Sequence, residues 1–207
     1  MSDDAAPRAI GPVAEPGPTL TTPRLILRRW HEADLEPFAR LNADPDVMEF
    51  FSHPLDRAAS DGFVERIEAQ FGRRGYGLWA VERPADGAFL GFTGLAYQAF
   101  EAAFTPCVEV GWRFARAAWG HGYATEAARE ALRFGFETVG LPGIVSLTSV
   151  GHERSRRVME RLGMRHDPAE DFDYAPLPPD DPHRRHVLYR LGRADWAHRA
   201  GSDGPIR

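Results

Sequence analysis

Residues 109–127 read EVGWRFARAAWGHGYATEA. Strand character over 108–114 gives way to the apolar spacing of a helix from Thr125 onward. Between them lies the segment Trp119–Ala124, which contains Gly120 and Gly122. A loop that ends on a helix N-terminus offers unpaired N–H groups and the positive end of the helix dipole, and glycines let an anion approach the backbone. This stretch therefore predicts a phosphate or pyrophosphate site.

Three interpretations compete for this loop. A Walker P-loop ends in Gly-Lys-Ser/Thr, and the chain contains no lysine. A dinucleotide-binding fingerprint needs a third small residue at the position of Thr125, and it needs an initial strand of a βαβ unit. Neither condition is met here. The third interpretation is an ordinary glycine-containing turn without a ligand, which is the commoner outcome for an isolated Gly-x-Gly.

The remaining pattern predicts a mixed α/β architecture. Pro84–Gly87 marks a turn, and the strands on either side of it indicate an antiparallel meander. Asp34 is expected to cap a first helix, and Ala59, Phe63, Ile67 and Phe71 form an apolar stripe on the second. In order, we expect a strand at 24–30, helices from 34 and over 56–74, strands at 78–82, 89–97 and 108–114, a helix over 125–139, a strand at 144–150, a helix over 155–162 and a strand at 186–191. This order is layered and is not a strictly alternating doubly wound one.

Three further segments accompany residues 109–114 and 119–127: TPRLILR at 22–28, HERS at 152–155 and RLGM at 161–164. Together these segments resemble the acetyl-CoA-binding core of the GNAT superfamily. The similarity is to the branch that acetylates ribosomal-protein N-termini (RimJ/RimL type), and it covers about 20–191. It implies an α/β (mixed α+β) fold with a central, mostly antiparallel sheet of about seven strands, flanked by helices and splayed between the fourth and fifth strands. It also implies transfer of an acetyl group from acetyl-CoA to a primary amine, without a metal.

Carried over by position, the resemblance also implies the cofactor site. Backbone amides of the loop hold the pyrophosphate, and the end of the preceding strand pairs with the pantetheine and polarises the thioester carbonyl. His152 stands where the branch has asparagine, and it starts the helix that carries Ser155. The expected cofactor-binding residues are Trp112, Arg113, Phe114, Trp119, Gly120, His121, Gly122, Tyr123, Ala124, Thr125, His152 and Ser155.

The expected catalytic residues are Glu109 and Ser155. Many superfamily members carry a tyrosine acid at the position of Met159, so the resemblance implies that Ser155, four residues earlier on the same helix face, protonates the leaving thiolate. Strand alternation places Glu109 on the face opposite Val108 and Val110, where it is the candidate base for the amine. Its alternative is an ordinary strand glutamate paired with a surface arginine.

Two functions remain open at this point. The first is an N-acetyltransferase whose acceptor is a protein N-terminus or a small-molecule amine, with acceptor identity set by loops such as 44–55 and 165–185. The second is a non-catalytic acyl-CoA-binding or regulatory module of the same fold, which the replacements at His152 and Met159 make conceivable.

Composition narrows the classes of protein. The formal net charge is −5, so no global field favours nucleic acid, and no apolar run approaches the roughly 20 residues that span a bilayer. We expect a disordered leader at 1–18, one domain at 19–193 and a tail at 194–207, in a cytoplasmic monomer or homodimer. His183 and His186 have no further ligands at zinc spacing, so no metal is expected. The single cysteine, Cys107, is expected to be a packed, inert thiol.

Overall fold

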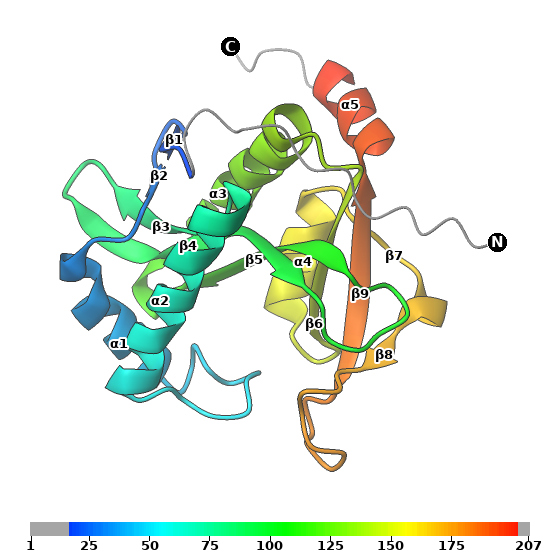
Figure 1. Cartoon of the computed structure of the whole chain (residues 1–207), viewed down its shortest axis with the longest axis horizontal. Coiled ribbons are helices and arrows are strands. Elements are labelled where there is room, and N and C mark those ends of the chain that lie inside the picture. Colours follow the sequence, from blue (N-terminus) through cyan, green and yellow to red (C-terminus); the bar gives the residue numbers. More distant parts are fainter. Residues whose placement is uncertain (1–16, 203–207) are drawn as a thin grey trace.

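A computed structural model of the chain describes residues 17–202, which form one nine-stranded sheet covered by helices (Figure 1). The sheet order is β1-β2-β3-β4-β5-β6-β9-β7, with β8 also paired to β9. The strands are β1 Leu20–Thr21, β2 Ile26–Arg28, β3 Leu78–Arg83, β4 Ala88–Gln98, β5 Cys107–Phe114, β6 Gly143–Ser149, β7 Arg165–His166, β8 Phe172–Asp173 and β9 Arg185–Gly192. The helices are α1 Leu35–Ala43, α2 Arg57–Arg74, α3 Tyr123–Arg133, α4 Glu153–Arg161 and α5 Arg193–Ser202.

The sheet is antiparallel everywhere except between β5 and β6. These two strands run parallel and share a single register pair, Glu109 with Val145. Counted from β2, they are the fourth and fifth strands, so the sheet opens where the splay is expected. The expected number of about seven strands is low, because β1, β7 and β8 are two-residue strands, too short for alternation to mark them.

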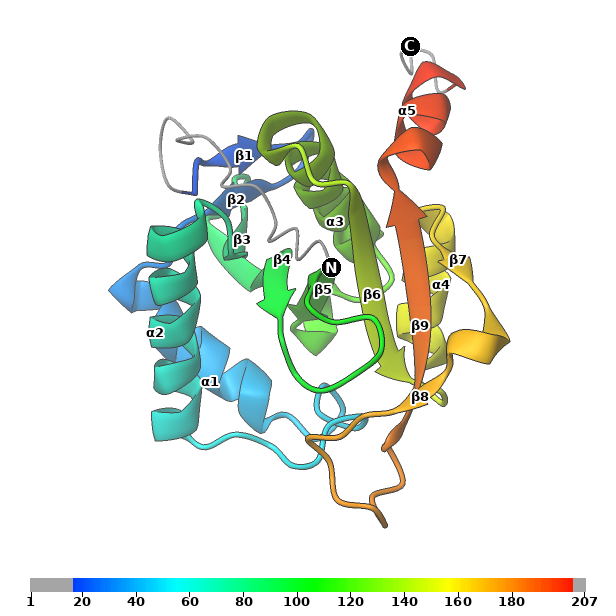
Figure 2. The same cartoon turned by 45° about the vertical axis from the view of Figure 1, so that its right-hand side comes forward.

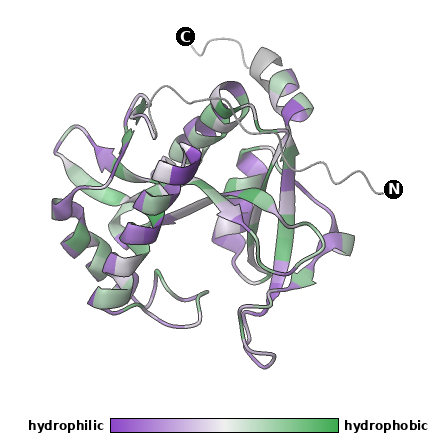
Figure 3. Ribbon diagram, in the orientation of Figure 1, coloured by the Kyte–Doolittle hydropathy of each residue, from purple (hydrophilic) through white to green (hydrophobic). Residues whose placement is uncertain are grey.

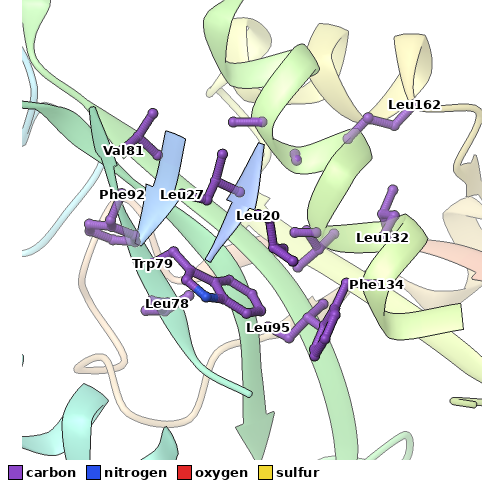
Figure 4. Close-up of a cluster of buried hydrophobic side chains, with 14 of the residues drawn as sticks. Leu20, Leu27, Leu78, Trp79, Val81, Phe92, Leu95, Leu132, Phe134 and Leu162 are labelled. Carbon is purple, nitrogen blue, oxygen red and sulfur yellow. The ribbon is translucent and has the colours of Figure 1, made fainter. Parts of the chain in front are cut away.

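The helices lie on both faces of the sheet (Figure 2). On one face, Phe92 of β4 packs against Phe38 of α1 and Phe63 of α2, with ring centroids 5.9 and 5.7 Å apart. On the other face, Leu95 packs against Gly135, in the π-helical turn Phe134–Val139 that continues α3. Figure 4 shows part of the resulting core, in which Trp79, Leu95, Leu132 and Phe134 lie together.

The apolar stripe predicted for α2 is wrong at its first residue. The buried side chains are Ser60, Val64, Ile67 and Phe71, whereas Ala59 is exposed and Phe63 is half-buried. Successive i+4 steps turn about 40° past a full turn each, so a stripe counted only in fours drifts off the core face. Figure 3 shows the mixture of hydrophilic and hydrophobic residues around this helix.

The predicted cap at Asp34 is also wrong. The Asp34 carboxylate makes no cap hydrogen bond to α1. It instead accepts hydrogen bonds from the Arg28 guanidinium at 2.7 and 2.9 Å and from the His31 N–H at 2.8 Å. A buried carboxylate is stabilised more by a bidentate arginine than by a single amide.

The chain ends differ from the expected division. A tail was expected at 194–207, but α5 covers 193–202, and the Trp196 indole donates to Glu137 at 3.1 Å while its ring stacks on Phe136. The leader expected at 1–18 lies outside the described residues except for Gly17 and Pro18, which bond to Gly75 and Trp79. None of the described helices is long and apolar enough to cross a membrane.

Candidate active site

The glycine loop leads directly into α3. Gly120 and Gly122 adopt left-handed backbone angles, with φ of 80° and 78°, and α3 starts at Tyr123, two residues before the predicted start. Six consecutive N–H groups, from Gly120 to Thr125, donate to no other group in the described part of the chain. The first amide that bonds back is Glu126, which donates to the Gly122 carbonyl at 3.1 Å. The loop is therefore a row of free donors at a helix N-terminus, suited to an anion.

Trp119 anchors this loop. Its own N–H donates to the Arg116 carbonyl at 3.1 Å, so this amide, which was expected to contact the cofactor, is already used. Its indole N–H donates to the Phe114 carbonyl at 2.9 Å, and the Arg154 guanidinium lies 4.4 Å from the ring centroid. The row of free donors thus runs from residue 120 to residue 125, and Trp119 ties it to the end of β5.

Arg24, two residues before β2, contacts the same loop. Its guanidinium donates to the His121 carbonyl at 3.0 Å, and it forms an ion pair with Glu126 at 2.5 Å. It also lies over the Tyr123 ring, 4.8 Å from the centroid. The TPRLILR motif therefore contributes a contact that holds the loop against α3.

Glu109 lies at the point where β5 and β6 separate. Its carboxylate accepts a hydrogen bond of 2.5 Å from the Gln98 side chain and another from the Leu147 N–H of β6. Burial raises the pKa of Glu109 to about 7, although both hydrogen bonds oppose the shift. Among the described residues it forms no ion pair, so the alternative of a glutamate paired with a surface arginine is not what the structure contains.

The N–H groups at the end of β5 divide between the two neighbouring strands. The Ala115 N–H donates to Leu90 of the β4 side at 2.9 Å. Because donors alternate along an antiparallel strand, the Arg113 N–H also points to β4, whereas those of Trp112 and Phe114 point toward the opening beside β6. Only two of the three predicted amides, those of Trp112 and Phe114, therefore face the opening, and the Arg113 amide does not.

His152 and Ser155 meet at the start of α4. The His152 Nδ1 accepts a hydrogen bond of 3.1 Å from the Ser155 N–H and so caps the helix. Burial, followed by nearby Arg154, lowers the pKa of His152 to about 4, so the imidazole is neutral at pH 7. Ser155 is buried, and its hydroxyl makes no hydrogen bond with the described residues, while Met159 is fully buried in the core. Ser155 thus has a hydroxyl that can donate a proton, whereas the Met159 side chain has no donor.

Three further residues near this region were missed from the sequence. Gln98 bonds to Glu109, Asn42 bonds to Arg113 at 2.6 Å, and the Tyr174 ring packs 4.9 Å from that of His186. Burial and then the charge of Glu109 raise the pKa of Tyr174, which places the phenol near that carboxylate. The contact of Asn42 with Arg113 joins segments 71 residues apart, and the other two depend on the register of neighbouring strands and on loop packing, so no local spacing signals them.

Cys107, the possible metal ligands and a surface hollow add no further group to the candidate site. Burial, then Glu109, raises the pKa of Cys107 to about 11, which keeps the thiol protonated, in line with the expectation of an inert residue. No group of three His, Cys, Asp or Glu side chains within residues 17–202 is arranged to hold a metal. A surface hollow of about 670 Å³, lined by Pro37, Leu41 and Phe89 among others, contains none of the predicted site residues.

Comparison with known proteins points to one family. The family described as "Acetyltransferase (GNAT) domain" matches residues 24–165. The chain is 37% identical over 148 residues to the uncharacterized protein YkkB of Bacillus subtilis, covering 70% of this chain and 84% of the relative. It is 31% identical over 186 residues to FsC-acetyl coenzyme A-N(2)-transacetylase of Aspergillus fumigatus, covering 86% and 78%. An acetyltransferase structure from Agrobacterium tumefaciens superposes with a TM-score of 0.68 at 30% identity, covering 84% and 94% of the two chains.

Proposed function

The chain belongs to the GNAT acetyltransferase family, and on that premise we propose that it transfers the acetyl group of acetyl-CoA directly to a primary amine. The observation that carries this proposal is the row of six free N–H groups from Gly120 to Thr125, at the end of a connection from the strand whose Glu109 has a pKa of about 7. The row suits the pyrophosphate, and Glu109 suits a base.

The loop and the strand opening would share the binding of acetyl-CoA. The amides of residues 120–125 hold the pyrophosphate, and the N–H groups of Trp112 and Phe114 are directed to where the pantetheine arm enters between β5 and β6. An N–H at this edge also stabilises the oxyanion that develops on the thioester carbonyl. Trp119 contributes by fixing the loop through its indole.

Glu109 would act on the acceptor. An amine of ordinary pKa is mostly protonated at pH 7 and must lose a proton before its nitrogen can attack the thioester carbon. A carboxylate with a pKa of about 7 accepts that proton directly or through water. The C–N bond then forms and the C–S bond breaks. The leaving thiolate takes a proton from the hydroxyl of Ser155, and the nitrogen gives up its second proton, through water, to restore that hydroxyl.

The acceptor class is a separate part of the proposal. The motifs at 22–28 and 152–164 favour the branch that acetylates ribosomal-protein N-termini, while the relative from Aspergillus fumigatus is named for acetylation of an N(2) position. A protein N-terminus and a small-molecule amine are therefore both candidates, and the loops at 44–55 and 165–185 would set the choice between them.

The test is turnover with acetyl-CoA against a panel of primary amines, including peptides with free N-termini, amino acids and polyamines. Thiol release is followed by absorbance, and each product is identified by mass spectrometry. We expect an N-acetylated product and thermal stabilisation by acetyl-CoA. Stabilisation without any product would support the acyl-CoA-binding module, and no stabilisation at millimolar acetyl-CoA would contradict the proposal.

A further inference from the structure

Arg113 is a half-buried cation without a counter-ion in the described part of the chain. Its Nη1 donates to the Asn42 Oδ1 at 2.6 Å, a neutral acceptor, and its Nε is buried without any hydrogen-bond partner. It takes part in no ion pair within residues 17–202. Burial lowers the pKa of Arg113 to about 10, so the guanidinium is still charged at pH 7. Withdrawing a charge partly from water without a counter-ion, and burying its Nε without an acceptor, costs free energy, and proteins rarely keep such a group without a use.

The surroundings fix the guanidinium without neutralising it. Its central carbon lies 4.1 Å from the Phe51 ring centroid, 5.6 Å from that of Phe92 and 5.9 Å from that of Phe63. The amide of Asn42 is itself held by the Ser60 hydroxyl at 2.9 Å. With Nη1 occupied and Nε buried, Nη2 is the donor that remains for a ligand, and a charged N–H donor of this kind suits a carboxylate oxygen.

Arg113 and Glu109 share one face of β5. Side chains at 109, 111 and 113 alternate to the same side, and a Cβ built on Gly111 would come no closer than 3.9 Å to any atom outside its neighbours. The strand between the base and the arginine therefore carries no side chain that would block a ligand. At about 3.3 Å per residue, Glu109 and Arg113 are about 13 Å apart along the backbone.

The loop between α1 and α2 spans the same region. The Phe51 ring lies over the Arg113 guanidinium. The ring of the adjacent Phe50 packs against His152 at the start of α4 and against His183, with ring centroids 4.3 and 5.7 Å apart. Glu49 also pairs with Arg154 at 2.8 Å. In Figure 2 this loop runs below the sheet toward the segment that precedes β9. It thus bridges the space between Arg113 and the predicted cofactor side.

We propose that Arg113 binds the carboxylate of the acceptor whose amine is placed at Glu109. The inference rests on the proposed amine acetylation and adds a substrate class to it: an amine that carries a carboxylate several bonds away, such as a short peptide or an ω-amino acid. The separation along β5 disfavours an α-amino acid, whose two groups are one carbon apart.

The test compares matched acceptors with the wild-type chain. The panel contains glycine through tetraglycine and the ω-amino acids from 4-aminobutanoate to 8-aminooctanoate, each beside its C-terminal amide. We expect at least one acid to exceed its amide at least 10-fold in kcat/KM, with the best acid longer than glycine. Equal rates for every acid and amide pair would overturn the inference while leaving amine acetylation intact. A chain that acetylates other amines but no acid in this panel would overturn it as well.

Variants then assign the preference to one side chain. Arg113→Met should bring the acid-to-amide ratio to about 1, and Arg113→Lys, which keeps the charge but not the planar guanidinium geometry, should lower it partly. The control is Arg116→Met, because Arg116 is exposed and pairs with Asp46. An acid preference that survives in a folded Arg113→Met or is lost in Arg116→Met would overturn the assignment. If Arg113→Met does not fold, the Arg113→Lys ratio decides.

Discussion

The Gln98 side-chain amide donates a hydrogen bond of 2.5 Å to the Glu109 carboxylate, across the pair of strands β4 and β5. This contact and the Leu147 N–H favour the ionised carboxylate, while burial favours the neutral acid. The balance places the pKa of Glu109 at about 7, where a base for an amine works near physiological pH.

Glu109→Gln should therefore lower kcat/KM by about 100-fold or more, because the amide cannot take the proton of the amine. The loss should shrink at high pH, where free amine becomes abundant. Steady-state kinetics from pH 6 to 10 check this, with acetyl-CoA binding measured separately. Glu101→Gln, an exposed carboxylate between β4 and β5, is the matched control and should keep normal rates. Normal turnover in folded Glu109→Gln would remove Glu109 from the mechanism.

The same variant should be more stable than the wild type at alkaline pH. Glu109 has a folded-state pKa raised from 4.5 to about 7, so its contribution to stability is full below pH 4.5 and is lost as pH rises through 7. Glutamine stays neutral, and at pH 8 the free energy of unfolding of Glu109→Gln should exceed that of the wild type by about 1 to 3 kcal/mol. Urea unfolding at pH 5 and pH 8 measures the difference. A difference that does not change with pH would mean that the carboxyl group is well solvated.

Gly122→Val should weaken acetyl-CoA binding and also destabilise the fold. Gly122 has a φ of 78°, and a Cβ there would lie 3.6 Å from Arg24, so the backbone angle is the main obstacle. Forcing a branched residue into this conformation costs about 1–3 kcal/mol. Thermal shifts measure both effects, since wild type at 100 times the Kd of acetyl-CoA should gain about 2.7 kcal/mol. Acetyl-pantetheine, which lacks the pyrophosphate, is the ligand control. Equal shifts with both ligands would contradict a pyrophosphate site at this loop.

Ser155→Ala should lower kcat by roughly 10- to 1000-fold and leave acetyl-CoA binding nearly unchanged, if the hydroxyl protonates the thiolate. The competing donor is Tyr174, whose phenol lies near Glu109. Tyr174→Phe should keep kcat within a few-fold. Single-turnover rates at saturating acetyl-CoA compare the two variants. The reverse pattern would assign the proton to Tyr174, and two normal rates would assign it to solvent.

His152→Asn should remove an acid sensitivity from the fold. The folded-state pKa of His152 is lowered from 6.5 to about 4, so its contribution to stability is present above pH 6.5 and is lost as pH falls through 4. Asparagine keeps the cap on the Ser155 N–H without titrating, whereas His152→Ala loses it at a cost of about 1 kcal/mol. Thermal melts at pH 5 and pH 7.5 separate these effects. An equal drop in Tm for wild type and His152→Asn on acidification would contradict the neutral cap.

The sequence by itself determined the order of the longer elements, the mixed α/β class and the glycine loop at the start of α3. These follow from local rules: runs of strand-forming residues between turn residues mark β3, β4 and β5, and glycine spacing marks the loop near Gly120 and Gly122. The family resemblance further indicated the opening between β5 and β6, which the single pair of Glu109 with Val145 confirms.

The tertiary structure alone decided the features that depend on long-range contacts and on burial. Local spacing cannot show that Asn42 contacts Arg113 71 residues later, or that Asp34 binds Arg28 instead of capping α1. The pKa values of Glu109 and His152 likewise depend on how many atoms of distant segments exclude water from each group. Residue type names a possible acid, base or cation, and its chemistry is set by neighbours that only the folded chain brings together.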